Sequence, residues 1–450
     1  MQYVLSHYGH RYVQNLARSS ALDAALARDD DRLLCELLAH GAVPRAGNGA
    51  LDALAARGFV ASVNDDVPLD DVRLRYARNP LEHLSRVVFE YTTVCNLDCA
   101  HCRNANLEAH ATADPAPLRR VVDAMLPLGV ARFDFIGGEV TLYGKGWLDL
   151  VAYLRAAGAG HASVTTSGWF LGETNFLAAG ERYADDRAYL RALRGRGLTH
   201  VVFSLDGPED VHDRCRGVPG LYRRVLEGFD KAREAGLQPR VSAVVGMGVP
   251  VSTSLAWLAD VSARLFGPAP DRDVALRRVL GDESNYVSNF IDVGGGVQLR
   301  RSKRDLAAHS DEALRCKNFF RPSPTFRVKA TGEVALCPLV EGGDGYGNVR
   351  ERDVVDILNH LDEAFVARMH AERRVGEHRR LLDAEVFGGS LGHVCTARTA
   401  LNMVARAVHE RGVSPDDAAA VRAINVEVAE KMGVLPRALR HRALGHARRD

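Results

Sequence analysis

Between residues 86 and 280 the sequence alternates short β-branched runs with longer stretches of helical periodicity. This alternation constrains the fold most, because strands that alternate with helices form a parallel sheet through right-handed crossovers. The predicted strands are Val87–Tyr91, Phe133–Ile136, Ala162–Thr166, Val201–Leu205, Val241–Val245 and Val274–Val279. The predicted helices are Pro117–Leu128, Trp147–Ala157, Arg187–Arg196, Leu221–Ala235 and Ser254–Leu265.

Each of these strand–helix units spans roughly thirty residues, the usual length of a βαβ unit. We therefore expect an α/β fold, with the sheet curved into a partial (β/α)6 barrel that is similar to a TIM barrel. In such folds the chemistry lies at the carboxyl ends of the strands. The loops that meet there would follow Tyr91, Ile136, Thr166, Leu205 and Val245.

The segments on either side of this barrel, which is expected over 81–300, have a different character. Residues 1–80 predict a small α+β module: Tyr3–Leu5 and Tyr12-Val13 resemble strands around a polar turn, and leucines at 33–38 and 51–54 have helical spacing. It is either a winged-helix-like module that binds a peptide or a cap on the barrel edge. Residues 301–410 predict a β-hairpin with helices, and residues 411–450 a basic helical tail.

Composition excludes several classes of function. The chain has 58 Lys plus Arg and 57 Asp plus Glu, a net charge of +1, so we expect no nucleic-acid partner. No apolar run approaches about 20 residues, so we expect no membrane span. The N-terminus lacks the pattern of a signal peptide, which favours a cytoplasmic protein. In that reducing compartment the eight cysteines are expected to serve metal binding or catalysis rather than disulfides.

Three cysteines follow directly on the first predicted barrel strand. Cys95, Cys99 and Cys102 have the spacing C-x3-C-x2-C. Three thiolates within eight residues converge on a metal or a cluster. A structural zinc site normally has four protein ligands. The absence of an adjacent fourth cysteine favours a [4Fe-4S] cluster with one open iron over a zinc loop or three core thiols.

This spacing, placed after the first strand of a βα barrel, resembles the radical S-adenosylmethionine (SAM) superfamily. The sequence Gly137-Gly138-Glu139 after the second strand resembles the GGE motif of that family. The resemblance implies that the glycines let the backbone approach SAM and that the glutamate accepts from its ammonium group. It also implies that His101 occupies the place of an aromatic residue near adenine, and that Ser167, Ser204 and Asp206 contact SAM or substrate.

The family resemblance implies a reaction as well. SAM would chelate the open iron, one electron from the cluster would cleave it to a 5′-deoxyadenosyl radical, and the radical would abstract hydrogen from substrate. An electron donor such as flavodoxin or ferredoxin is the implied protein partner.

A second set of cysteines lies in the last third of the chain. Cys316, Gly332 and Cys337 form C-x15-G-x4-C, followed by Gly347-Asn348-Val349, which resembles the opening of a SPASM/Twitch extension. With Cys395 as a third ligand, the resemblance implies one auxiliary [4Fe-4S] cluster of the Twitch type. Its fourth iron is open or held by a group such as His393. The alternative is three buried thiols without iron.

Two cysteines remain. Cys35 lies among leucines at helical spacing and is expected in the core. Cys215 lies in a segment that starts at Ser204 and ends at Gly217, and that resembles the SPASM-type "SLDG…HD..RG" sequence. A thiol there can return a hydrogen atom to a substrate radical, as in radical SAM epimerases. The alternative, which we favour, is a small apolar filler.

Three functions are compatible with this sequence. The first is a radical SAM enzyme that modifies a precursor peptide by a crosslink, a thioether or an epimerisation, with residues 1–80 binding the peptide. The second is a radical SAM dehydrogenase or epimerase that acts on a small molecule, such as a sugar or aminocyclitol, in natural-product biosynthesis. The third is a non-catalytic zinc or iron–sulfur protein, which leaves the GGE motif without a purpose.

Overall fold

A computed structural model gives the fold. It describes residues 2–19, 24, 26–44, 49–64, 68, 79–82, 84–102, 104, 109–144, 146–245, 249, 251–281, 286–289, 325–335, 346–361, 378–387 and 394–432. In these ranges no helix is long and apolar enough to cross a membrane.

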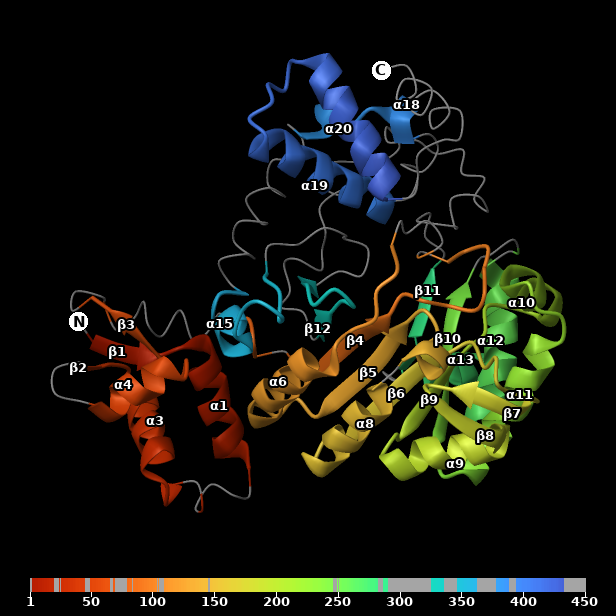
Figure 1. The fold of residues 1–450 in the computed structure, drawn as a ribbon, viewed down its shortest axis with the longest axis horizontal. Coiled ribbons are helices and arrows are strands. Elements are labelled where there is room, and N and C mark those ends of the chain that lie inside the picture. The colour runs from red at the N-terminus through yellow and green to blue at the C-terminus, as the bar shows by residue number, and fades with distance from the viewer. Residues whose placement is uncertain are drawn as a thin grey trace.

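Among the described residues, six strands of the main sheet run parallel to one another in chain order, and the sheet does not close on itself (Figure 1). A β-hairpin from the C-terminal part of the chain continues the sheet beyond β4, giving the order β11-β10-β9-β6-β5-β4-β12-β13. The fold is therefore the expected partial (β/α)6 barrel, and the carboxyl ends of its strands share one edge. The parallel strands are β4 (Arg86–Thr92), β5 (Arg132–Gly137), β6 (His161–Thr166), β9 (His200–Ser204), β10 (Gln238–Val245) and β11 (Tyr286–Asn289).

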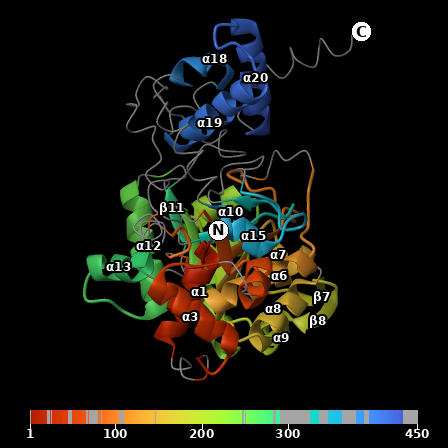
Figure 2. The ribbon, with the colours of Figure 1, turned by 90° about the vertical axis from the view of Figure 1, so that its left-hand side faces the viewer.

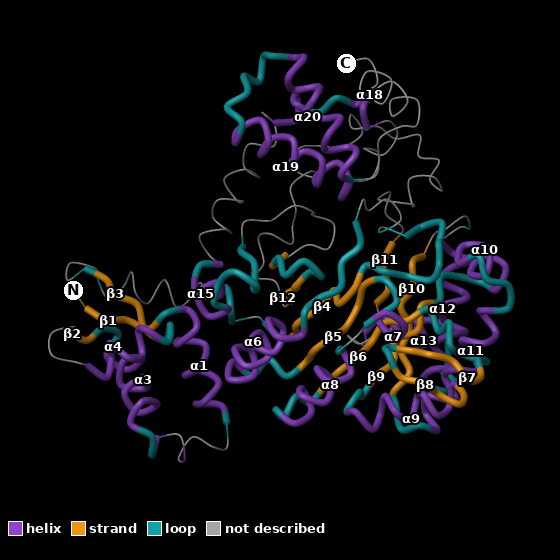
Figure 3. Tube along the Cα trace, in the orientation of Figure 1, coloured by secondary structure: helices purple, strands orange, loops and turns teal. Residues whose placement is uncertain are grey.

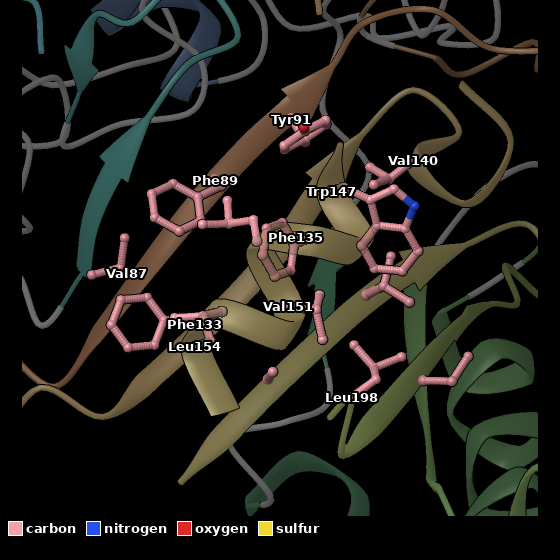
Figure 4. Packing of buried hydrophobic residues seen from close by; sticks show 14 of the residues in the cluster. Val87, Phe89, Tyr91, Phe133, Phe135, Val140, Trp147, Val151, Leu154 and Leu198 are labelled. Carbon is pink, nitrogen blue, oxygen red and sulfur yellow. The ribbon is translucent and has the colours of Figure 1, made fainter. Parts of the chain in front are cut away.

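Helices cover the outer face of this sheet (Figure 3). Phe89 of β4 stacks on Phe133 of β5, and Phe135 meets Trp147 edge to face at 5.8 Å between ring centroids (Figure 4). Burying one such ring contributes about 2–3 kcal/mol. The helices that follow the strands are α6 (Pro115–Met125), α8 (Trp147–Ala156), α9 (Asp186–Arg196), α11 (Leu221–Glu234) and α12 (Val251–Phe266).

The prediction of a strand at Val274–Val279 is wrong. These residues lie in the helix α13 (Arg272–Gly281), and the sixth strand is β11. The side chain of Asp271 accepts a hydrogen bond from the Val274 N–H and caps the helix. Ala275 and Val279 are four residues apart, so both face the interior as buried residues of one helical stripe.

A small antiparallel hairpin follows β6, where the sequence predicted only a loop. It consists of β7 (Thr174–Ala178) and β8 (Glu181–Asp185). The Ala179 N–H donates to the carbonyl of Leu142, in the short helix α7 (Val140–Tyr143), and so fixes the turn against the barrel.

Residues 2–63 form the expected α+β module, with a three-stranded sheet in the order β2-β1-β3. The prediction of a strand at Tyr12-Val13 is wrong, because Ser6 accepts a hydrogen bond from the Gly9 N–H and starts a helix there. The elements are β1 (Gln2–Leu5), α1 (His7–Arg18), α3 (Asp29–His40), β2 (Val43–Pro44), α4 (Gly49–Ala56) and β3 (Val60–Val63).

This module is docked on the rest of the molecule, as Figure 2 shows from its side. The hydroxyl of Tyr8 donates to the carbonyl of Ala124 at the end of α6. Asn359, in α15 (Val354–Asn359), accepts from the Tyr8 N–H at 2.9 Å and donates to the carbonyl of Gly58 at 2.9 Å. The module therefore contacts both the barrel and the C-terminal part of the chain.

The predicted C-terminal hairpin is present as β12 (Thr325–Val328) and β13 (Val334–Ala335), which pair in antiparallel fashion. Farther along the chain, α18 (Ala384–Phe387), α19 (Val394–Glu410) and α20 (Ala418–Lys431) pack around an apolar cluster of their own. Figures 1 and 2 place these three helices apart from the barrel, on the side of the strands' carboxyl ends.

Candidate functional site

The three cysteines near residue 100 lie on the loop that follows β4, at the carboxyl edge of the sheet. Cys99 is buried, and Cys95 and Cys102 are half-buried. The Cys102 N–H donates to the Cys99 carbonyl at 2.9 Å and closes a tight turn between them. The Ala100 N–H donates to the carbonyl of Cys215 at 2.9 Å, so the loop is fixed to helix α10 (Glu209–Arg216).

The thiols share one electrostatic environment. Burial raises the pKa of Cys99 to about 11, and the charges of Cys95 and Cys102 act in the same direction. Burial raises the pKa of Cys95 as well, while a hydrogen bond from the Leu97 N–H to its sulfur opposes this shift. The Arg216 guanidinium opposes the shift at both thiols, and coordination by a metal would add further positive charge.

In the described ranges no three His, Cys, Asp or Glu side chains converge closely enough to hold a single metal ion. A four-iron cluster binds each thiolate at a different iron, so its ligands surround a larger volume than those of one ion. The donor set of three thiols on one loop fits such a cluster better than it fits one zinc ion.

Gly137 and Gly138 bring the end of β5 against the residues that lead into the cysteine loop. A Cβ atom on Gly137 would lie 2.0 Å from the Thr92 carbonyl oxygen, and one on Gly138 would lie 2.1 Å from that of Val94. The Gly138 and Glu139 N–H groups donate to these two carbonyls at 2.6 and 2.8 Å. The close approach that requires glycine here is thus between two segments of the chain itself.

Glu139 organises the ends of two strands through its buried carboxylate. Its Oε1 accepts from the hydroxyls of Thr141 and Thr166 at 2.6 and 2.8 Å. Its Oε2 accepts from the N–H and the hydroxyl of Ser167 at 2.8 and 2.7 Å. Of the predicted site residues, Glu139 and Ser167 are therefore in direct contact.

A second set of contacts joins the end of β9 to the cysteine loop. Asp206 is buried, its Oδ2 accepts from Nε of Arg216 at 2.8 Å, and Nη2 of Arg216 lies 2.7 Å from the same oxygen. The remaining nitrogen, Nη1, donates to the sulfur of Cys99 at 3.8 Å. Nε2 of His101 lies 3.5 Å from Asp206 Oδ2. The structure thus brings the predicted residues Cys99, His101 and Asp206 together.

Charges around Asp206 determine its ionisation. Burial alone would raise the pKa of Asp206, but the Arg216 guanidinium holds it below its usual value. Burial lowers the pKa of His101. Burial, reinforced by Arg216, lowers the pKa of His212 to about 4. At neutral pH the site therefore contains a carboxylate, a guanidinium and two neutral imidazoles.

The other predicted residues lie as follows. Ser204 is buried at the end of β9. The thiol of Cys215 is packed with Val211 and against Val244, in apolar surroundings that favour the filler interpretation. Cys35 packs at the edge of the N-terminal module's core, as expected.

Much of the second cysteine set lies outside the described residues, namely Cys316, Cys337 and His393. Cys395 belongs to the first turn of α19. Two other parts of the motif do meet: the Val349 N–H donates to the Gly332 carbonyl, and the Val334 N–H donates to that of Gly347, each at 2.9 Å. The glycine turn and the Gly347-Asn348-Val349 segment are therefore one local unit.

Sequence reasoning missed Arg216 and His212 as site residues. Both stand in the segment from Ser204 to Gly217 that drew attention for its cysteine. An arginine ten residues after an aspartate was the available signal, but only the fold shows that this arginine pairs with the aspartate and also reaches Cys99.

Comparisons with known proteins indicate a family for the barrel. Residues 89–253 match the family model of the Radical SAM superfamily. The chain is 27% identical over 252 residues to an AdoMet-dependent heme synthase of Oleidesulfovibrio alaskensis, covering 54% of this chain and 55% of that one. It is 26% identical to a probable GTP 3′,8-cyclase of Pyrobaculum aerophilum, covering 63% of this chain and 94% of that one.

The chain spans between a third and just over half the length of several curated relatives that it matches. Among solved structures, Streptococcus suis SuiB bound to the precursor peptide SuiA is 14% identical, with a TM-score of 0.39, over 69% of this chain and 75% of that one.

Proposed function

We infer that this chain, which carries a radical SAM domain over residues 89–253, is an enzyme that cleaves S-adenosylmethionine reductively and abstracts hydrogen from a substrate. The observation that supports this most is the cysteine loop at the carboxyl edge of the sheet, held against Gly137-Gly138-Glu139 by backbone hydrogen bonds. A structural zinc loop has no need of this second motif.

In this proposal Cys95, Cys99 and Cys102 hold a [4Fe-4S] cluster. The residues proposed to surround SAM are His101, Gly137, Gly138, Glu139, Ser167, Ser204 and Asp206. When bound, the cluster supplies one electron to the sulfonium and so gives a 5′-deoxyadenosyl radical that takes hydrogen from substrate. The chain's part is to hold and orient the cofactors and to exclude water. Flavodoxin or ferredoxin would deliver the electron, in the reducing environment of the cytoplasm.

We propose a precursor peptide as the substrate, modified by a crosslink, a thioether or an epimerisation. The support is the N-terminal module, whose three-stranded sheet has an exposed residue, Ser62, on its edge strand β3. Extended peptides bind such edges by adding a strand. Because Asn359 and Tyr8 fix the module to the body, a peptide bound there would remain near the barrel.

A small molecule is the second candidate substrate. The curated relatives are named as a heme synthase and a probable GTP cyclase, which are not peptide maturases by name. In that case the reaction would be a dehydrogenation or epimerisation, for example of a sugar or aminocyclitol, and the N-terminal module would only cover the barrel edge.

We further propose an auxiliary [4Fe-4S] cluster on Cys316, Cys337 and Cys395. Gly332, which is part of the same spacing, has a positive φ of 91° and is fixed to the Gly347–Val349 segment. Two four-iron clusters require about eight irons per chain. Reconstituted protein with about four would contradict the auxiliary cluster and leave the first cluster standing.

The reaction is tested with reduced, reconstituted protein and SAM. We expect release of 5′-deoxyadenosine by the wild type and none by Cys95→Ala, with Cys35→Ala as the matched control that retains activity. Release by Cys95→Ala at the wild-type rate would contradict the proposal.

The substrate class is tested by binding. A peptide encoded beside this gene should bind the full-length protein, and Ser62→Pro, on the edge strand, should weaken binding without changing SAM cleavage. Binding of an aminocyclitol or sugar in place of any such peptide would favour the second candidate.

A further inference from the structure

Arg216 has an arrangement that the proposed function does not use. Its Nε donates to Oδ2 of Asp206 at 2.8 Å, and its Nη2 lies 2.7 Å from the same oxygen in an ion pair. The third, Nη1, donates to the sulfur of Cys99 at 3.8 Å. The side chains of Arg216 and Asp206 are only 12% and 1% exposed, so water screens these contacts weakly.

The geometry of the guanidinium makes the contact with Cys99 directional. The group is planar, so the two contacts with the Asp206 carboxylate restrict its plane. The direction of the third nitrogen is restricted with it. Asp206 is fixed in turn, because its Oδ1 accepts from the Val244 N–H at 3.3 Å. The loop is fixed too, through the bond from Ala100 to Cys215, the residue next to Arg216.

Arg216 is also the charged donor in this group of contacts. His101 and His212 face Asp206 as well, at 3.5 and 4.0 Å, but burial favours their neutral forms. Leu97 donates to Cys95 through a neutral backbone N–H. A cationic donor adds charge–charge attraction to its hydrogen bond with a thiolate, which a neutral backbone N–H does not.

We propose that Arg216 is a positioning residue that sets the reduction potential of the cluster held by Cys95, Cys99 and Cys102. This inference rests on the proposed function, since it requires that cluster. On one-electron reduction the cluster gains a negative charge, with no bond or proton transferred. A cation that donates to a ligand sulfur stabilises that reduced form and raises the potential.

The experiment compares the midpoint potential of the reconstituted full-length protein without SAM, reduced stepwise by dithionite and followed by EPR. Arg216→Gln removes the charge and the fork, and we expect the reduction equilibrium constant to fall about tenfold, which is about 59 mV for one electron. Arg216→Lys keeps the charge without the planar fork, so we expect a smaller fall. Arg214→Gln is the matched control, because Arg214 is exposed on the same helix and pairs with Asp210; its potential should equal that of the wild type.

The iron content of each protein shows whether a negative result contradicts the proposed function or only the role of Arg216. Wild type without iron would overturn the proposed function, whereas Arg216→Gln with full iron and an unchanged potential would overturn only this inference. If Arg216→Gln takes up no iron, the lysine variant decides: a potential below the wild type supports the inference, and an unchanged one overturns it. If two clusters are present, only one of the two reduction steps should move.

Discussion

At Gly138 the end of β5 lies against the backbone that leads to Cys95, with space for a hydrogen atom and nothing larger. A methyl group there would meet the Val94 carbonyl, which belongs to the backbone and cannot rotate away. We expect Gly138→Ala to lower the free energy of unfolding by about 1–3 kcal/mol. Because the displaced segment continues into the cysteine loop, iron uptake should fall as well.

Urea unfolding and iron analysis measure these effects, with Gly160→Ala as the control. A Cβ on Gly160 meets nothing within 4 Å, so both quantities should stay near those of the wild type. If Gly138→Ala and Gly160→Ala have the same free energy of unfolding and the same iron uptake, β5 and the cysteine loop can move apart without loss of stability.

Asp134, on β5, is a fully buried carboxylate at some distance along the strand from the cysteine loop. It accepts from the Ser163 hydroxyl at 2.6 Å and lies 3.2 Å from both Arg132 Nε and His161 Nε2. Burial would raise its pKa, but these partners outweigh burial and hold the pKa well below the usual value. We expect Asp134→Asn to lower the free energy of unfolding by about 3 kcal/mol at pH 7, because it leaves buried partners uncompensated.

The pH dependence of that loss follows from the direction of the shift. The pKa of Asp134 in the native state lies below the unfolded value of about 3.9. Ionised Asp134 therefore contributes its full share of the free energy of unfolding above roughly pH 5, and this share is lost as the pH falls toward the native pKa. Urea unfolding at pH 7, 5 and 3.5 should give a difference between wild type and Asp134→Asn that narrows only at the lowest pH. A constant difference would mean that the ionised form is not what stabilises the fold.

The site could be predicted where it depends on residues close together in the chain. The placement of Cys95, Cys99 and Cys102 on one loop after the first barrel strand is such a case, because their spacing spans only eight residues. The contact between Arg216 and Cys99 joins residues 117 positions apart, and depends on where α10 lies over the sheet. Spacing in the sequence contains no signal for that distance.

At the level of elements, the predicted strand and helix order was right where apolar periodicity is long. The prediction of secondary structure failed at short segments where a capping residue determines whether a helix begins. Ser6 caps α1 and Asp271 caps α13, so β-branched residues that follow each cap are helical in spite of their strand propensity. The hairpin β7–β8 was missed because its strands are short and carry apolar residues such as Leu177 on the exposed face, which breaks the alternation, and because its fixing contact, to Leu142, lies far back in the chain.

Helix α15 contacts the N-terminal module through Val355 and through hydrogen bonds of Asn359. Asn359 contacts the Tyr8 N–H and the Gly58 carbonyl, and both lie where the module meets the body. We expect Asn359→Ala to lower the free energy of unfolding by about 2 kcal/mol, because it leaves the Tyr8 N–H without a partner and removes one of the two side-chain hydrogen bonds to the Gly58 carbonyl, which the Ser6 hydroxyl retains. Hydrogen exchange should then accelerate in α1 and β3 more than in the barrel strands.

His360→Ala is the matched control for this variant. His360 is the next residue, is exposed, and pairs with Asp356 at the surface, where such pairs contribute little. Its exchange pattern should equal that of the wild type. If hydrogen exchange in Asn359→Ala accelerates equally in the module and the barrel, the N-terminal module does not open independently of the barrel.

At the scale of the whole molecule, two apolar clusters without a common residue account for different parts of the described chain. One extends from the barrel into the C-terminal hairpin and α15, and includes Tyr8 of the N-terminal module. The other is confined to residues 381–432 and holds α18, α19 and α20 together. The sequence indicated helices in this last segment, but placed a domain boundary at residue 410, between α19 and α20, which pack on each other.

Separate clusters predict separate unfolding steps. Leu401, in α19, and Leu150, in α8, are both almost fully buried, each in its own cluster. Replacing either by alanine should cost about 2–5 kcal/mol in the unit that contains it. Hydrogen exchange of the full-length protein should therefore accelerate in α18–α20 alone for Leu401→Ala, and in the barrel helices and strands for Leu150→Ala. The two variants serve as controls for each other, since they make the same change at the same burial. Acceleration throughout the chain in both would mean that the helical unit and the barrel unfold as one, through contacts that the two clusters do not include.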